Sequence, residues 1–331
     1  MNIRHYISFF IKNVIKMLTL LIGVSIAAFM LVSLSPIDPV QANVGATAYM
    51  RMTPEKRAQM ESYWGKDVPP AERYLNWAKD FVRGDMGTSL KYNRPVAEVV
   101  AEKFGNSFAL MCVAWVLSGI LGLVLGIVAG YFKDRLPDRL IRGYALLLAS
   151  TPAFWIGLLL LMIFAVWLGW PFGMNLPAGM TAAEAGIGVR IRHLLLPALT
   201  LGLTGVANIT LHTREKMIAI MESDYVLFAR ARGESSGYIV KRHALRNLVL
   251  PAITLQFASI SEIFGGSVLV EQVFSYPGLG QAAIDAGLGG DVSLLLAITV
   301  ISTLFVFLGN LVANVLYGVI DPQIRRGRSH G

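Results

Sequence analysis

The sequence predicts an all-α integral membrane protein with six transmembrane helices, and three observations lead to that prediction. Hydrophobic residues make up 55% of the 331 residues and charged residues only 15%, which is unlike a soluble domain. Five stretches carry the roughly 20 mostly apolar residues that a spanning helix needs. None alternates apolar and polar residues as a membrane barrel strand would, so helices are expected to satisfy the backbone in lipid.

The six expected spans differ in strength along the chain. The weakest, Leu194–Leu211, is short and contains Pro197 and Asn208. It is counted because without it the termini and the basic loops fall on inconsistent sides of the membrane. The five longer spans carry few or no charges and are Met17–Leu34, Ser107–Tyr131, Leu140–Trp170, Pro251–Phe274 and Ser293–Ile320.

The positions of Lys and Arg predict the orientation. With six spans, 17 of the 29 basic residues fall on one side: in residues 1–16, in the loop Lys133–Arg142, between the fourth and fifth spans, and in the tail. Short positively charged loops stay in the cytoplasm, whereas long segments translocate largely regardless of charge. Both termini are therefore expected in the cytoplasm. The net charge of +8 reflects this topology, and no nucleic-acid partner is expected.

Two features near the ends of the early spans have simple interpretations. Val40-Gln41-Ala42 resembles a signal-peptide cleavage site, but the apolar core before it exceeds the about 7 to 15 residues of such peptides, so the first span is expected to be retained. The only cysteine, Cys112, lies in the second span, which excludes an intrachain disulfide. It is expected to be a buried small hydrophobic residue.

The segment 36–106 is expected outside the cytoplasm, with short amphipathic helices near the membrane surface. Pro54–Trp64 and Pro70–Arg83 each begin with Pro, a favoured first helical residue. Gly84–Ser89 is expected to turn, and Pro95–Phe104 to begin a helix that leads into the second span. A passive lid and a docking surface for an external partner are both compatible with this pattern.

The segment Asp224–Pro251 predicts a charged helical hairpin. Apolar stripes of Tyr225, Val226, Phe228 and Ala229, and of Ile239, Val240, Ala244, Leu245 and Leu248, predict two short helices. Gly233 is expected to end the first helix, and Ser235 or Ser236 to cap the second. Composition alone favours a snorkelling basic loop that only sets topology over an element that transmits force from a soluble partner.

Sequence motifs shift that balance, because the hairpin resembles the cytoplasmic coupling motif of ABC-importer permeases of the peptide/opine/nickel family. The similar residues are Ala229-Arg230-Ala231-Arg232-Gly233, His243-Ala244-Leu245-Arg246-Asn247 and Leu250-Pro251. The second group departs from the Ile-x-Leu-Pro typical of sugar and amino-acid permeases. Further similar segments, in the same order along the chain, are Leu34–Val40, Gly84–Leu90, Ser150–Trp155, Val270–Gly280 and Ile320–Arg326.

The resemblance implies a type I ABC-importer permease, the first of two homologous permease subunits, in a bacterial inner membrane. Two ABC ATPase subunits and an extracytoplasmic substrate-binding protein are the other implied partners. No phosphate-binding loop is present, since Gly65-Lys66 is followed by Asp, so ATP and Mg are expected only on partner subunits and the chain itself is no enzyme. The implied ATPase-coupling residues are Asp224, Ala229, Arg230, Ala231, Arg232, Gly233, His243, Arg246 and Asn247.

The implied domains are 1–35, the N-terminus and first span; 36–106, the extracytoplasmic segment; 107–320, a five-helix core with the coupling hairpin 216–250; and 321–331, the cytoplasmic tail.

Two acids are candidates for the translocation pathway. Glu262 is the only acid well inside a span, where a charge is costly and indicates function, although a contact with the neighbouring permease is an equal alternative. Glu271, at the outer end of the same span, can instead organise the following loop. Glu262 before an apolar pair and Gly265-Gly266 resembles nickel permeases, which favours nickel or a nickel chelate as cargo. One carboxylate is a poor nickel site, and the amino terminus of a di- or oligopeptide is the alternative.

Other polar residues are assigned structural roles or an outer gate. Pro277, Gly278 and Gly280 begin an expected extracytoplasmic gate loop, whose run Gln281–Ala286 is apolar and precedes Asp291, a candidate N-cap for the last span. Asn310 and Asn314 lie one turn apart and predict interhelical hydrogen bonds. His212 is expected at a solvated helix end, with a metal-binding role as the alternative.

Two other classes of protein fit less well. A secondary transporter is expected to show an inverted repeat with several acids at the membrane midplane, and this chain shows neither. An intramembrane hydrolase needs a nucleophile and a base, and Ser261 beside Glu262 without a membrane His does not supply them.

Overall fold

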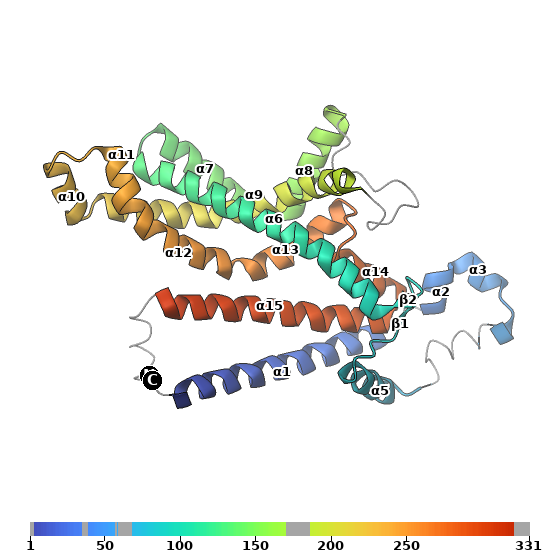
Figure 1. The fold of residues 1–331 in the computed structure, drawn as a ribbon. Helices are drawn as coiled ribbons and strands as arrows, with labels where there is room; N and C mark the ends of the chain where they lie inside the picture. The colour runs from blue at the N-terminus through green and yellow to red at the C-terminus, as the bar shows by residue number, and fades with distance from the viewer. Residues whose placement is uncertain (1–2, 35–38, 57, 59–67, 170–185, 321–331) are drawn as a thin grey trace. The chain divides into compact units, whose positions relative to one another are not determined.

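The computed structural model describes residues 3–34, 39–56, 58, 68–169 and 186–320. Within them the chain is almost entirely helical, with one two-stranded sheet (Figure 1). The first part contains α1 (Ile3–Ser33), α2 (Pro39–Val44), α3 (Ala46–Arg51), α5 (Pro70–Val82), β1 (Thr88–Ser89) and β2 (Arg94–Pro95). The remainder contains α6 (Val96–Tyr131), α7 (Leu136–Ser150), α8 (Ala153–Leu161), the π-helix η1 (Met162–Trp167), α9 (Ile187–Met221), α10 (Asp224–Ala231), α11 (Ser236–Ile239), the π-helix η2 (Val240–Ala244), α12 (Leu245–Ala258), α13 (Ile260–Val273), α14 (Leu279–Gly289) and α15 (Val292–Ile320).

Four helices of the described part are long and apolar enough to cross a membrane: α1 from Ile11, α6, α9 and α15. Two bent pairs, Leu136–Ser150 with Ala153–Trp167 and Ser236–Ala258 with Ile260–Val273, raise the number to six if each pair is one span. This range includes the six spans predicted from the sequence. The short predicted span Leu194–Leu211 is part of a 35-residue helix, α9, which accommodates Pro197.

The predicted third span, Leu140–Trp170, is wrong as a single helix. Helices α7 and α8 meet at 105°. Thr151 is extended, with φ −104° and ψ 124°, because the proline ring of Pro152 disfavours the helical conformation of the residue before it. Pro152 also lacks the N–H that would continue the helical hydrogen bonds. The fifth predicted span also bends, by 49° at Ser259, and Pro251, its predicted start, lies inside α12, which begins at Leu245.

The chain forms two compact units. The first comprises residues 1–107 and 277–307, and the second comprises residues 108–276 and 308–331. In the first unit the predicted helix from Pro70 is α5, whereas most of the predicted helix Pro54–Trp64 lies outside the described residues. The predicted turn at Gly84–Ser89 includes Gly84 and Gly87 at positive φ and leads into the pairing of Ser89 with Arg94.

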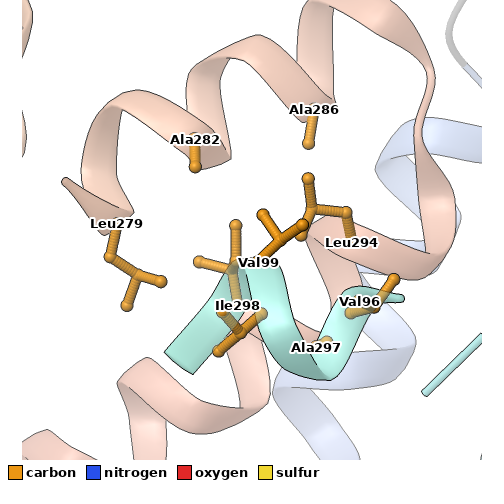
Figure 2. Close-up of a cluster of buried hydrophobic side chains, with 9 residues drawn as sticks. Val96, Val99, Leu279, Ala282, Ala286, Leu294, Ala297 and Ile298 are labelled. Carbon is orange, nitrogen blue, oxygen red and sulfur yellow. The ribbon is translucent and has the colours of Figure 1, made fainter. Parts of the chain in front are cut away.

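An apolar core holds the first unit together. It joins the first turns of α6 with α14 and the start of α15, and Figure 2 shows its side chains pointing toward one another. Small alanines on α14 and α15 allow these helices to approach α6 closely. The buried members are Val96, Val99, Val100, Leu279, Ala282, Ala286, Leu294, Ala297 and Ile298.

The second unit is built around a close contact of α6 with α9. Glycines recur on α6 at helical spacing, and a Cβ at Gly126 would lie 2.5 Å from the Cβ of Thr213. Only glycine permits this approach of the two helices. Helices α7 and α8 also pack on α9, and α8 packs on α13. Cys112 is exposed on α6 within this unit, so the prediction that it is buried is wrong.

Candidate functional site

The predicted hairpin is present in the second unit and turns at Gly233. Helix α10 ends at Ala231, and Gly233 has φ +83°, a conformation that side chains with a Cβ rarely adopt. The backbone N–H of Glu234 donates to the carbonyl of Ala229 at 3.1 Å, which closes the turn. Ser235 is the N-cap of α11, although its side chain forms no capping hydrogen bond. The predicted end of the first helix at Gly233 is thereby confirmed.

The hairpin is packed onto the end of α9 through a small apolar core. Val226 and Ala229 of α10 are fully buried, and Met217 and Ile220 of α9 complete the contact. The second arm of the hairpin contributes three buried residues to the same core, Ile239, Ala244 and Leu248. The hairpin is therefore continuous in packing with the long helix that precedes it.

Half of the apolar stripe predicted for α10 is wrong. Tyr225 is 43% exposed and Phe228 is 69% exposed, and Leu227 is 65% exposed. Helix α10 has only eight residues, and the face toward α9 accommodates the pair three residues apart, Val226 and Ala229. Tyr225, Leu227 and Phe228 therefore form an exposed apolar side of α10.

Charged and polar residues organise the outside of the hairpin. Glu234 accepts from Arg232 at 2.8 Å and lies 3.1 Å from Nε2 of His243, so it links the two arms. Asn247 donates through Nδ2 to the carbonyl of His243 at 2.9 Å. Asp224, Arg230, Ala231 and Arg246 are exposed. The structure thus brings the nine predicted coupling residues into one compact element, with Ala229 in its core.

Glu262 lies on an exposed face of α13. Glu262, Gly265, Leu269 and Gln272 are exposed and recur three or four residues apart, so they share one side of the helix. On the neighbouring side, Oγ of Ser261 donates to Oδ1 of Asn310 on α15 at 2.8 Å. This contact confirms the predicted interhelical hydrogen bond of Asn310, whereas Asn314 is exposed.

Glu271 has a different environment from Glu262. It is fully buried, and its carbonyl accepts from the backbone N–H of Tyr276 at 2.8 Å. Burial and the charge of Glu271 together raise the pKa of the Tyr276 phenol to about 12. These contacts support the interpretation that Glu271 organises the loop after α13.

The predicted gate loop is firmly attached within the first unit. The carbonyl of Pro277 accepts from Nδ2 of Asn106 at 2.9 Å, and the N–H of Leu279 donates to Oγ of Ser107 at 2.7 Å. Gly278 and Gly280 are buried. The predicted apolar run Gln281–Ala286 lies inside α14.

Asp291 is a more extensive site than the sequence predicted. As expected of an N-cap, Oδ1 accepts from the N–H of Leu294 at 3.1 Å. Its other oxygen, Oδ2, accepts from Ser89 Oγ at 2.7 Å and from the N–H groups of Leu90 and Lys91 at 2.8 and 3.1 Å. Asp291 is fully buried. Ser89 and Asp291 are 202 residues apart, so no local pattern could have revealed this pairing.

Metal ligands do not gather in the described part of the chain, where no group of three or more His, Cys, Asp or Glu could hold a metal ion. His212 is exposed, and its Nδ1 lies 3.0 Å from the carbonyl of Asn208. The predicted solvated position of His212 stays a prediction.

Comparisons with known proteins agree with these features. Residues 122–326 match the family described as binding-protein-dependent transport system inner membrane component. The chain is 33% identical to the oligopeptide transport system permease protein AppB of Bacillus subtilis over 324 residues, which cover 96% of this chain and 99% of that protein. It is also 33% identical to the glutathione transport system permease protein GsiC of Escherichia coli K12 over 319 residues, with the same coverage.

Proposed function

Because the chain belongs to the family of binding-protein-dependent transport system inner membrane components, we propose that it imports di- or oligopeptides as one of two permease subunits of an ATP-driven importer. Family membership makes the chain an inner-membrane permease of the peptide family of ABC importers. The cargo is supported by AppB and GsiC, which are named for oligopeptide and glutathione transport. Both names describe short peptides.

Nickel, the cargo favoured by the sequence, has less support than the peptide alternative. Neither AppB nor GsiC is named for nickel transport. Nickel prefers imidazole ligands, and the described residues contain no cluster of three potential metal ligands. The names of these relatives and the lack of a metal-ligand cluster among the described residues therefore favour a peptide cargo over the nickel suggested by Glu262 and its neighbours.

Glu262 is proposed to attract the amino terminus of the peptide. A carboxylate facing lipid is costly, so an exposed Glu262 on α13 is expected to face either a water-filled path or the second permease. Besides the apolar Leu269, the same face carries the polar Gln272 and the small Gly265, and the polar side chain supports the water-filled path. Glu271, which is buried, is proposed to stabilise the loop that follows α13.

We also infer the partners and the topology of this chain from its membership of the family. The hairpin 216–250 docks on one of two ATPase subunits, with Leu227 and Phe228 as its exposed apolar contacts. Each bent helix pair counts as one span, which gives six spans with both termini in the cytoplasm. The segment 36–106 and the loop from Pro277 to Gly280 face an extracytoplasmic binding protein, and 321–331 is a cytoplasmic tail. ATP-driven closure of the ATPases shifts the permeases between two states that bind them with different affinity.

Uptake by the assembled importer in proteoliposomes tests the cargo. We expect ATP-dependent uptake of a labelled dipeptide, no uptake of radioactive nickel, and no ATPase activity of the purified chain alone. Nickel uptake without peptide uptake would reverse the assignment.

The role of Glu262 requires a matched pair of cargoes. Glu262→Gln is expected to lower the uptake of a dipeptide with a free amino terminus by about tenfold, because it removes one close charge interaction. Uptake of the N-acetylated dipeptide by the variant and by the unmodified chain should be equal. An equal loss for both cargoes would assign Glu262 to the contact with the second permease.

A further inference from the structure

A buried ion pair connects α7 to α9 close to the base of the hairpin. Asp138 lies in the first turn of α7 and Arg214 lies on α9. Nε of Arg214 donates to Oδ1 of Asp138 at 2.5 Å and Nη2 donates to Oδ2 at 2.7 Å. The two parallel hydrogen bonds form the bidentate arrangement that fixes the orientation of both side chains. The side chain of Asp138 is 1% exposed and that of Arg214 is 13% exposed.

The turn before α7 is also held by this carboxylate. Oδ2 of Asp138 accepts from the N–H of Asp134 at 2.8 Å, and Asp134 has φ +62°, an unusual value for a residue with a side chain. Next to it, Lys133 contacts Glu222 at 2.5 Å. Both of these side chains are largely exposed, so that second bridge contributes little. The Asp138–Arg214 pair is therefore the main polar connection between this turn and α9.

Arg214 is on the same helix as the residues that hold the hairpin. Met217, one turn further along α9, is fully buried in the apolar core that contains Val226 and Ala229. Helix α10 is therefore packed against the part of α9 that carries Arg214. The guanidinium of Arg214 donates two hydrogen bonds to Asp138. A movement of α9 relative to α7 would therefore break a buried ion pair, which is energetically costly.

The far end of α7 is connected to other helices of the second unit through α8. After the 105° bend at Pro152, α8 packs on α9 and α13. A Cβ at Gly157 of α8 would lie 3.2 Å from the ring of Phe274 and 3.4 Å from Val273, which shows how close the end of α13 is. Helix α13 carries Glu262.

We propose that Asp138 and Arg214 are positioning residues for transport: their ion pair makes α7 and α9 move together, so that hairpin displacement reaches α8 and α13. This inference rests on the proposed role of the hairpin. A buried ion pair adds little net stability compared with well-packed apolar residues, and its two-bond geometry is suited to fixing the relative position of two helices.

The test compares transport with ATP hydrolysis in the assembled importer. Asp138→Asn is expected to reduce the peptide transported per ATP hydrolysed by about tenfold, while ATP hydrolysis continues. Because this variant leaves Arg214 buried without its charged partner, the double variant Asp138→Leu/Arg214→Met provides a second measurement. Apolar replacement of a buried pair usually preserves stability, and the N–H of the exposed Asp134, which loses its acceptor as well, can bind water. The double variant should therefore lose little in unfolding temperature yet remain uncoupled.

A purely structural pair predicts the opposite for the double variant. Normal transport per ATP in Asp138→Leu/Arg214→Met, or failure of both variants to assemble, would overturn the inference. Lys133→Gln is the control that removes the neighbouring exposed bridge, and it should transport normally. Gly233→Val separates this inference from the proposed function: if Gly233→Val uncouples and the pair variants do not, only the role of the pair is wrong, whereas coupled transport in all of them would also reject the hairpin.

Discussion

The two compact units each contain a buried aspartate at the start of a long or bent helix, and the two carboxylates are held in different ways. Asp291 in the first unit accepts hydrogen bonds from a hydroxyl and three backbone N–H groups. Asp138 in the second unit accepts one backbone N–H and is otherwise paired with a guanidinium. Backbone N–H donors hold their own segment in place when they bind a carboxylate. The side chain of Arg214 instead connects Asp138 to a separate helix, α9.

The two aspartates therefore have different structural roles: Asp291 fixes the conformation of one segment, and Asp138 links two helices. Asp291 fixes residues 89–91 against the first turn of α15, so its loss should affect folding of the first unit most strongly. Asp138 joins two helices that each continue to other contacts, so its loss should be visible in transport. The following experiments test that distinction and the surface of the hairpin.

Removal of the Asp291 carboxylate is expected to have the largest effect. Asp291→Ala leaves four donors without their acceptor, three of them backbone N–H groups, and should destabilise the protein by about 3–5 kcal/mol. The measurement is thermal unfolding of the purified protein. Asp85→Ala is the control, because Asp85 is exposed and accepts the N–H of Gly87 at 2.8 Å on the surface. Equal melting temperatures for the two variants would contradict the role of Asp291 as an anchor.

Substitution at the hairpin turn should have a smaller effect on stability and a large effect on transport. Gly233→Val places a β-branched residue at φ +83°, which costs about 1–2 kcal/mol and should alter the angle between the two arms. ATP turnover and peptide uptake are measured together in proteoliposomes, and we expect hydrolysis without matching transport. Gly237→Ala, in open space within α11 and without a positive φ, is the matched control. Unchanged transport in Gly233→Val would mean that the turn does not transmit force.

Much of this architecture is predictable because local chemistry determines it. The glycine turn at Gly233 and the N-cap at Asp291 follow from short-range rules, and both are confirmed. The exposure of Phe228 was not predictable, because an eight-residue helix offers more apolar positions than α9 covers. The bend at Pro152 was available from the motif Ser150-Thr151-Pro152, but the continuous hydropathy on both sides of it concealed the break.

Contacts between distant residues account for the rest. Asp138 and Arg214 are 76 residues apart, and Ser89 and Asp291 are 202 apart. In the sequence, Arg214 is one basic residue among several that set topology, and nothing local distinguishes it. Only the packing of α7 on α9 gives it a partner.

The exposed side of α10 offers a test with a moderate effect. Phe228→Ala should weaken binding of the ATPase subunit by about tenfold, because large apolar side chains contribute strongly to interfaces. The unfolding temperature of the chain should not change, since Phe228 is 69% exposed. Binding is measured by titration of the purified ATPase against the permease in nanodiscs. A loss of stability without a loss of affinity would indicate that Phe228 belongs to the apolar core of the hairpin, as the sequence predicted.

The smallest expected effect is a pH dependence of the first unit. Burial and the nearby acids Asp285, Glu102 and Asp291 raise the pKa of the Tyr92 phenol to about 12, from about 10 in the unfolded chain. The stabilisation is complete below pH 10 and is lost as the pH rises toward 12, because the unfolded phenol loses its proton first. Thermal unfolding in this range should therefore depend less on pH in Tyr92→Phe than in the unmodified protein. If Tyr92→Phe unfolds with the same pH dependence as the unmodified protein, that dependence does not come from the Tyr92 phenol and the acids around it.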